Sequence, residues 1–274
     1  MRYRKIPINF LLSITGILGL ITILSACGTN LSDRTSTSTP TTTPDGVQKT
    51  IQRAIENLPK GQQLSKNTLL YKGPIEQTIP AGSFLSGTNI KYVGLTKDNT
   101  AEVSINGQRA FKRSTDSLDW TGSPVKGVQV QLSDRILWLD QERLRLAGTI
   151  RLKVDNVTPK TGSVPKIPDK PTPNLIVYKV PVIYRVKRGE AIPGTTLTYV
   201  GNTEKGAQLG GGGLPKDEYP YRQVGDSIAW QGQLRSGVYL NLLARTVLYN
   251  DDSLNVTGLA TIILSTGEST ARTP

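Results

Sequence analysis

Two Asp-Ser sequences carry the residue types that hydrolysis would use. They are DSLDW at residues 116–120 and DSIAW at residues 226–230. A serine nucleophile needs an adjacent general base and an oxyanion hole. The chain has no histidine and no complete set of the S-x-x-K, S-D-N and K-T-G motifs. Because an Asp-Ser pair ahead of a strand typically satisfies its own backbone in a turn, we predict two turns, no catalytic residues and a protein that is not an enzyme.

Paired carboxylates are the alternative route to catalysis. Glycoside hydrolysis uses two carboxyl groups about 5 to 9.5 Å apart. The candidates are Asp116, Asp119, Asp140 and Asp226, none of which lies in a specific motif. A cell-wall polysaccharide hydrolase therefore stays open as an alternative function. A carrier of a small apolar ligand is another, and it requires an apolar cavity.

The composition also limits bound groups. Cys27 is the only cysteine and histidine is absent, which excludes the usual structural zinc sites and disulfides. The run LGGGG at residues 209–213 lacks the Lys-Ser or Lys-Thr of a phosphate-binding loop. We therefore predict no metal and no cofactor.

The first 27 residues have the pattern of an export signal. Arg2, Arg4 and Lys5 precede an uncharged apolar stretch at residues 6–24, and Leu24-Ser25-Ala26-Cys27 ends it. This ending resembles the lipobox of bacterial lipoproteins, and the resemblance covers residues 1–27 only. It implies cleavage between Ala26 and Cys27 and lipidation of Cys27. An uncleaved transmembrane anchor is the alternative, because about 19 apolar residues just span a bilayer.

That resemblance and the charge indicate location and partners. Lipidation implies a cell-envelope protein, anchored on the outer side of the cytoplasmic membrane or in the outer membrane facing the periplasm. The formal net charge of +12 is spread along the whole chain. A diffuse basic surface favours anionic polymer, wall glycan or envelope proteins as partners over nucleic acid.

One long segment of the sequence occurs twice. The stretch IKYVGLT at residues 90–96 returns as LTYVGNT at 197–203, and residues 71–94 align without gaps on residues 178–201 with nine identities in 24 positions. Apolar and polar residues alternate at 128–132 and again at 238–242, as in half-buried strands. The sequence thus predicts an all-β fold of two homologous small sandwich or barrel units in tandem.

The remaining segments differ in composition. We divide the chain into a signal peptide at 1–26, lipidated Cys27 with a Ser/Thr/Pro tether to 45, a short amphipathic helix at 46–60, a first β repeat at 67–157, a Pro-rich linker at 158–174, a second β repeat at 175–265 and a tail at 266–274. The tether cannot bury enough apolar surface to fold. The linker should be extended and semi-rigid.

Matched and unmatched positions of the two repeats suggest different roles. Large aromatic residues at matched positions are predicted core anchors: Trp120, Trp230, Tyr92 and Tyr199. Arg145, Arg151 and Lys153 correspond to Asn255, Thr261 and Ile263, so one strand has a basic polar face and its counterpart a neutral one. We predict a partner surface at the three basic residues and at Tyr219 and Tyr221, which flank Pro220 in a loop.

Overall fold

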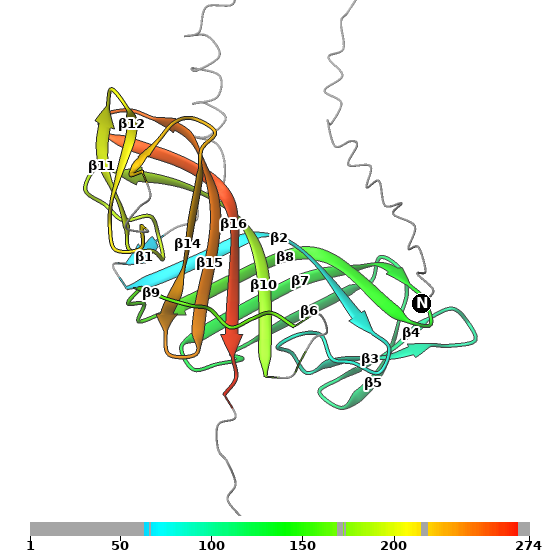
Figure 1. Ribbon diagram of the computed structural model, residues 1–274. Helices are drawn as coiled ribbons and strands as arrows, with labels where there is room; N and C mark the ends of the chain where they lie inside the picture. The colour runs from blue at the N-terminus through cyan, green and yellow to red at the C-terminus, as the bar shows by residue number, and fades with distance from the viewer. Residues whose placement is uncertain (1–62, 66, 169–171, 173, 215–218, 268–274) are drawn as a thin grey trace, which may run out of the picture. The chain divides into compact units, whose positions relative to one another are not determined.

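The structure, a computed structural model, describes residues 63–65, 67–168, 172, 174–214 and 219–267 (Figure 1). Ala26, Cys27, the tether and the helix predicted for residues 46–60 lie outside the described residues, so these predictions stay predictions.

The described chain is all-β, as predicted, and its sheets are antiparallel. The first long sheet has the order β1-β2-β8-β7-β6, with strands β1 (Gln63–Ser65), β2 (Thr68–Pro80), β6 (Ser117–Gly122), β7 (Val128–Leu139) and β8 (Arg143–Asp155). A three-stranded sheet inserted between β2 and β6 consists of β3 (Ile90–Leu95), β4 (Ala101–Ile105) and β5 (Gln108–Lys112).

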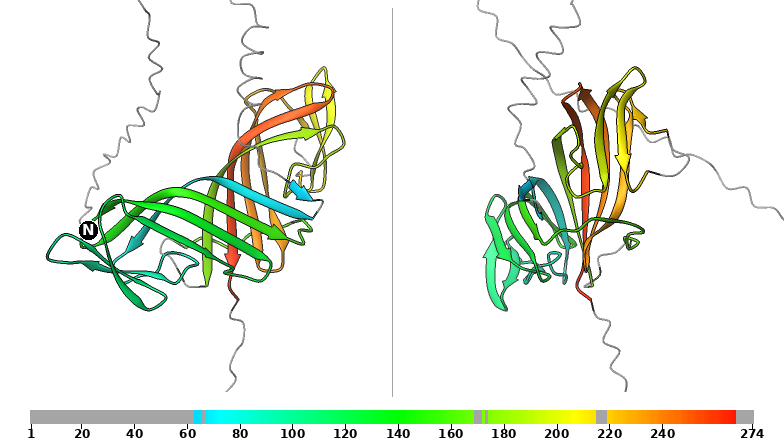
Figure 2. Two further views of the ribbon diagram at one scale, coloured as in Figure 1. Left: turned by 180° about the vertical axis from the view of Figure 1, so that it is seen from behind. Right: turned by 90° about the vertical axis from the view of Figure 1, so that its left-hand side faces the viewer.

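The second half of the chain has a matching set of sheets. The long sheet has the order β10-β16-β15-β14-β9, with strands β9 (Lys160–Thr161), β10 (Leu175–Lys187), β14 (Ser227–Arg235), β15 (Val238–Tyr249) and β16 (Ser253–Ser265). Its three-stranded sheet consists of β11 (Leu197–Thr203), β12 (Gly206–Gly211) and β13 (Tyr221–Arg222). Figure 2 shows these strands from two further sides.

Alternation of side chains creates the core. On β7, Val128, Val130 and Leu132 are buried while Gln129 and Gln131 are exposed, which is the period expected for a strand with one face on a core. β15 repeats this pattern. The buried apolar side chains of residues 69–157 and 176–264 form one continuous cluster.

Two tyrosines help to join the halves. The Tyr178 hydroxyl of β10 donates to the Ser86 carbonyl at 3.2 Å, beside Gly87. The Tyr71 hydroxyl of β2 lies 3.0 Å from where a Cβ on Gly194 would be. Each tyrosine thus reaches a glycine turn of the other half. Burial raises the pKa of both hydroxyl groups.

Two glycines act differently from the sequence prediction. Gly148 interrupts the apolar alternation of residues 144–154 and Gly258 is its counterpart, a pattern that predicts a shared bulge or tight bend, but the ladders keep their register through both. A Cβ on Gly148 would lie 2.0 Å from the Ser133 carbonyl, and one on Gly258 would lie 2.2 Å from the Leu243 carbonyl. The bulge interpretation is therefore wrong: glycine is needed because the neighbouring strand approaches too closely for any side chain.

The predicted linker is partly ordered into the second sheet. Lys160 and Thr161 form β9 and pair with β14 at one edge of that sheet, whereas β10 forms the opposite edge. The chain between them must therefore cross the sheet. In the view of Figure 1, residues 162–168 run across β14, β15 and β16.

Candidate functional site

The outer face of the first long sheet carries the basic residues singled out in the sequence. Cross-strand pairing places Lys72 of β2 beside Arg151 of β8, and Arg151 beside Gln131 of β7. The basic face, as we name it, consists of Lys72, Gln129, Gln131, Trp138, Arg145, Arg151 and Lys153. Exposed Glu76 of β2, which pairs with Ala147, lies on the same side of the sheet. Paired residues in adjacent antiparallel strands have Cβ atoms about 4.5 to 5.5 Å apart, so Lys72 and Arg151 are close neighbours.

Few of these cations have a carboxylate partner. The Lys153 ammonium lies 3.1 Å from Asp155 Oδ1. Within the described residues, the salt bridges involve Arg109, Arg143 and Lys153, so Lys72, Arg145 and Arg151 have none. Like charges directly opposite each other on a sheet are unfavourable. An anion that binds between such cations reduces their repulsion.

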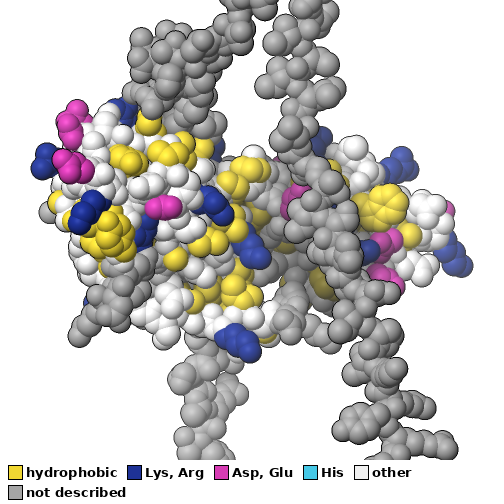
Figure 3. Space-filling view, turned by 45° about the horizontal axis from the view of Figure 1, so that its top comes forward, with side chains coloured by type: hydrophobic (Ala, Val, Ile, Leu, Met, Phe, Trp, Pro, Cys, Tyr) yellow, Lys and Arg dark blue, Asp and Glu magenta, His cyan; other side chains and the backbone are white. Residues whose placement is uncertain are grey.

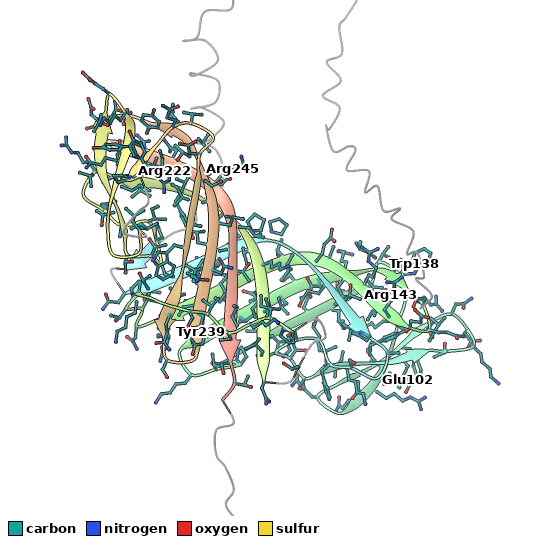
Figure 4. All side chains as sticks on the ribbon, in the orientation of Figure 1. Glu102, Trp138, Arg143, Arg222, Tyr239 and Arg245 are labelled. Atoms are coloured by element: carbon teal, nitrogen blue, oxygen red, sulfur yellow. The ribbon has the colours of Figure 1, made fainter. Side chains whose placement is uncertain are left out.

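One end of the basic face carries an exposed indole. The β7 ladder has a bulge between Ile136 and Trp138, and Trp138 pairs with Arg145 on the outer face. The Trp138 indole N–H donates to Asp140 Oδ2 at 3.1 Å, and Figure 4 shows Trp138 and Arg143 at this end of the sheet. Backbone N–H groups of Arg143 and Glu142 lower the pKa of Asp140. The carboxylate therefore orders the hairpin beside the indole.

The outer face of the second sheet is different. Lys179, which corresponds to Lys72, pairs with Thr261 and so has no cationic neighbour on β16. Asn255, Thr261 and Ile263 are buried, whereas Arg145 and Arg151 are exposed and Lys153 is half-buried. Lys and Arg side chains elsewhere are scattered, as the face in Figure 3 illustrates.

The structure does not join the predicted tyrosines to these basic residues. Tyr221 lies on β13 of the second three-stranded sheet, and its ring centroid is 4.9 Å from that of exposed Tyr219. The Lys205 ammonium lies 5.6 Å from the Tyr221 centroid. The partner surface predicted from sequence is thus divided between two different sheets.

The predicted core anchors occupy matched surroundings. Tyr92 and Tyr199 are buried and donate to the carbonyls of Asp140 and Asn250, each at the turn of the following long hairpin. The indole of Trp230 is buried, and its N–H donates to Thr196 Oγ1 at 2.9 Å. Trp120 is only half-buried and donates to Asn89 Oδ1 at 2.9 Å.

The suspected catalytic carboxylates lie in turns and on the surface. Asp116 Oδ2 accepts the Arg113 N–H at 2.8 Å, and Asp226 Oδ2 accepts the Gln223 N–H at 2.7 Å. Asp119 is exposed on β6, and Asp140 caps the β7–β8 turn. Among the described residues, no group of three or more His, Cys, Asp or Glu is placed to hold a metal ion.

Sequence reasoning missed a buried carboxyl. Asp134 is 1% exposed in the core of the first sheet. Gln77 Nε2 donates to its Oδ2 at 3.1 Å, while Oδ1 has no hydrogen-bond partner in the described part of the chain. Burial raises the pKa of Asp134 to about 6. The sequence did indicate this burial, because Asp134 continues the series of alternate residues, Val128, Val130 and Leu132, whose side chains face the core.

A cavity of 760 Å³ lies at the meeting of the two halves. Its lining combines apolar residues with one basic and one acidic residue, and comprises Leu69, Val157, Pro159, Lys187, Glu190, Ala191, Ile192, Pro193, Gly194 and Thr195. Its volume is within the usual range of small-molecule sites.

Fold and site together define an all-β protein with a basic face on one long sheet. No protein-family model matches the chain, and no curated protein or solved structure matches it. In the part of the chain that the structure describes, no helix is sufficiently long and apolar to cross a membrane.

Proposed function

We propose that this protein is a non-catalytic, lipid-anchored binding module of the cell envelope whose basic face binds an anionic polymer. The observation that carries the proposal is the pairing of Lys72 with Arg151, neither of which forms a salt bridge among the described residues. The lipobox resemblance at Cys27 supports the location.

A gene duplication is part of the proposal. The long strands β2, β8, β7 and β6 match β10, β16, β15 and β14 in order, and a three-stranded sheet follows the first strand in each half. Turn contacts match too: the Gly82 N–H donates to the Tyr92 carbonyl at 2.8 Å, and the Gly189 N–H donates to the Tyr199 carbonyl at 2.7 Å. These matches, with the repeated sequence, support two homologous β units in tandem.

The geometry favours an extended anion over a small one. Along β8, alternate residues on one face recur about every 6.6 Å, and neighbouring strands lie about 4.8 Å apart. Arg145 and Arg151 therefore lie about 20 Å apart on the same strand. A polymer with repeated anionic groups can contact both, and guanidinium groups pair with phosphate or carboxylate in bidentate fashion.

Polyphosphate binding tests the proposal. The fragment 51–274 contains the complete core cluster, and its affinity for long-chain polyphosphate and for orthophosphate can be measured at low and high salt. We expect salt-sensitive binding of the polymer and a roughly fivefold loss in the K72Q/R151Q double variant, since each of the two exposed ion pairs that it removes contributes about 0.5 kcal/mol.

A matched variant in the second half is the control. K179Q/R185Q removes the same charge from exposed positions of β10, where Lys179 pairs with Thr261 and Arg185 with Asn255. It should lower affinity by less than twofold. Equal losses of affinity in the two double variants would show that only the net charge of the protein matters. That result would contradict a binding site on the basic face.

Two alternatives receive different support. The carboxylates suspected of hydrolysis bond to turn backbone or lie exposed on a strand, which supports a non-catalytic module. The cavity of 760 Å³ favours a carrier of an apolar ligand as the second candidate function. Saturable fluorescence of an apolar dye, lost on changing the exposed lining residue Ala191 to Glu, would support the carrier.

A further inference from the structure

The outer face of the three-stranded sheet β3–β5 exposes large apolar side chains. Phe84 is 59% exposed, Val93 43% and Phe111 56%. Val93 projects from a bulge between Tyr92 and Gly94. Single exposed apolar residues are ordinary, but several on one face mark an interaction surface.

Strand pairing places these residues on the same side of the sheet. Phe84 forms a bridge with Lys91, Lys91 pairs with Ser104, and Ser104 pairs with Arg109. Phe111 is two residues beyond Arg109 on β5, so its side chain shares that face. Glu102 pairs with Phe111 and lies on the same face. We call the set Phe84, Lys91, Val93, Glu102, Ser104, Arg109 and Phe111 the aromatic face.

Each phenyl ring has a cation beside it. The Lys91 ammonium lies 5.9 Å from the Phe84 centroid, and the Arg109 guanidinium carbon lies 5.3 Å from the Phe111 centroid. Both distances are within the range of cation–π contacts. Arg109 Nε also lies 2.6 Å from Glu102 Oε1, which fixes the guanidinium over its ring. Glu102 is labelled on this sheet in Figure 4.

The surroundings are positively charged. Residues 84–113 contain two acidic residues, Asp98 and Glu102, and five basic ones, Lys91, Lys97, Arg109, Lys112 and Arg113, so the net charge is 5 minus 2, or +3. Lys and Arg side chains near an anionic membrane surface are attracted to it.

We propose that the aromatic face binds the surface of a bilayer that contains anionic lipids. The rings would enter the boundary between headgroups and acyl chains, and the adjacent cations would lie at the phosphates, as in other interfacial contacts. Phenylalanine favours lipid over glycan as the occupant, because its ring has no hydroxyl or N–H to bond a hydrated sugar. This contact uses another surface and another ligand than the basic face.

Vesicle binding tests the assignment. The fragment 51–274 lacks the signal segment and Cys27, so any sedimentation with vesicles reflects its own surface. With vesicles of equal parts phosphatidylglycerol and phosphatidylcholine we expect binding at least fivefold tighter than to phosphatidylcholine alone. The F84S/F111S variant should lose at least tenfold in affinity.

Exposed apolar residues of the second half give the matched control. Val224 is 62% exposed and Leu243 61%, so V224S/L243S removes comparable apolar surface elsewhere and should change vesicle affinity by less than twofold. K72Q/R151Q should likewise leave most vesicle binding intact, which separates this surface from the basic face.

A label on the aromatic face keeps the test independent of the phenylalanine variants. S104C would be the only thiol in the fragment 51–274, and an environment-sensitive dye on it should shift to the blue when anionic vesicles are added. An unshifted dye, equal binding to neutral vesicles, or unchanged binding by folded F84S/F111S would each overturn the proposal. So would sedimentation with an insoluble polysaccharide that persists when vesicles show no binding.

Discussion

The sheet β2-β8-β7-β6 and the sheet β10-β16-β15-β14 have the same strand order but differ in the core and on the outside. In the core, Asp134 of β7 lies beside Gly148, where Ala244 of β15 lies beside Gly258. On the outside, exposed Arg151 stands where Thr261 is buried. The two glycine positions, where backbones approach closely, are alike, whereas Asp134 and Arg151 differ from their counterparts. The ladder is thus compatible with two quite different outer faces.

Substituting the paired glycines should cause the largest loss of stability, and the loss should be similar in the two halves. Gly148→Ala and Gly258→Ala would each push a methyl group against a backbone carbonyl, at 2.0 and 2.2 Å. Because backbone cannot move aside without breaking the ladder, we expect each variant to lose at least about 3 kcal/mol in free energy of unfolding. Urea denaturation monitored by circular dichroism measures the loss.

Gly162→Ala is the control for this pair. Nothing lies within 4 Å of a Cβ at Gly162, so its free energy of unfolding should change by less than about 0.5 kcal/mol. A large loss for only one of the two paired glycines would show that the two ladders are not constrained alike.

Asp134 should make the stability of the first half depend on pH in a way that the second half does not share. Its pKa is raised by burial from 3.8 to about 6 in the folded protein. The folded state therefore binds the proton more tightly than the unfolded state, and this contribution is fully present below about pH 4 and lost as pH rises through about 6. We expect the free energy of unfolding to fall by up to about 3 kcal/mol across this window.

Asp134→Asn should remove that pH dependence and stabilise the protein at pH 7.5 by about 2 kcal/mol. The amide keeps the bond from Gln77 without the cost of a buried charge. The reverse change, Ala244→Asp, should introduce the same pH dependence into the second half. A flat pH profile for the parent chain would show that Asp134 is hydrated in solution.

The sequence was sufficient to predict the fold class, because the alternation of apolar and polar residues along a strand is a local property. Val128, Val130 and Leu132 indicate a strand without knowledge of their partners. Strand order and the shared core depend on contacts between distant residues, such as Tyr178 with Ser86, and local patterns do not encode them. The role of Gly148 was misread for the same reason, since the Ser133 carbonyl that excludes a side chain lies on another strand.

The candidate site could be predicted only in part. A comparison of the two repeats singled out Arg145, Arg151 and Lys153, because an alignment shows that their counterparts in the second repeat have no charge. Lys72 was not singled out, since both repeats have lysine there and only cross-strand register shows that it faces Arg151. The aromatic face was missed altogether, because Phe84 precedes the three-stranded sheet and the other residues come from its three separate strands.

The smallest predicted effect bears most directly on the proposed function. Lys72→Gln removes one of two neighbouring positive charges, so the free energy of unfolding should rise by about 0.5 kcal/mol at low ionic strength. The gain should vanish near 1 M salt, where the screening length falls to about 3 Å. Lys179→Gln faces Thr261 and should change nothing at either salt concentration. If the two variants behaved alike, Lys72 and Arg151 would not repel each other in solution. The basic face would then have no repulsion between cations for an anionic polymer to relieve.

Polyphosphate gives the last test of this repulsion. If Lys72→Gln raises the free energy of unfolding, saturating polyphosphate should abolish that increase, because the bound anion would offset the same repulsion that the substitution removes.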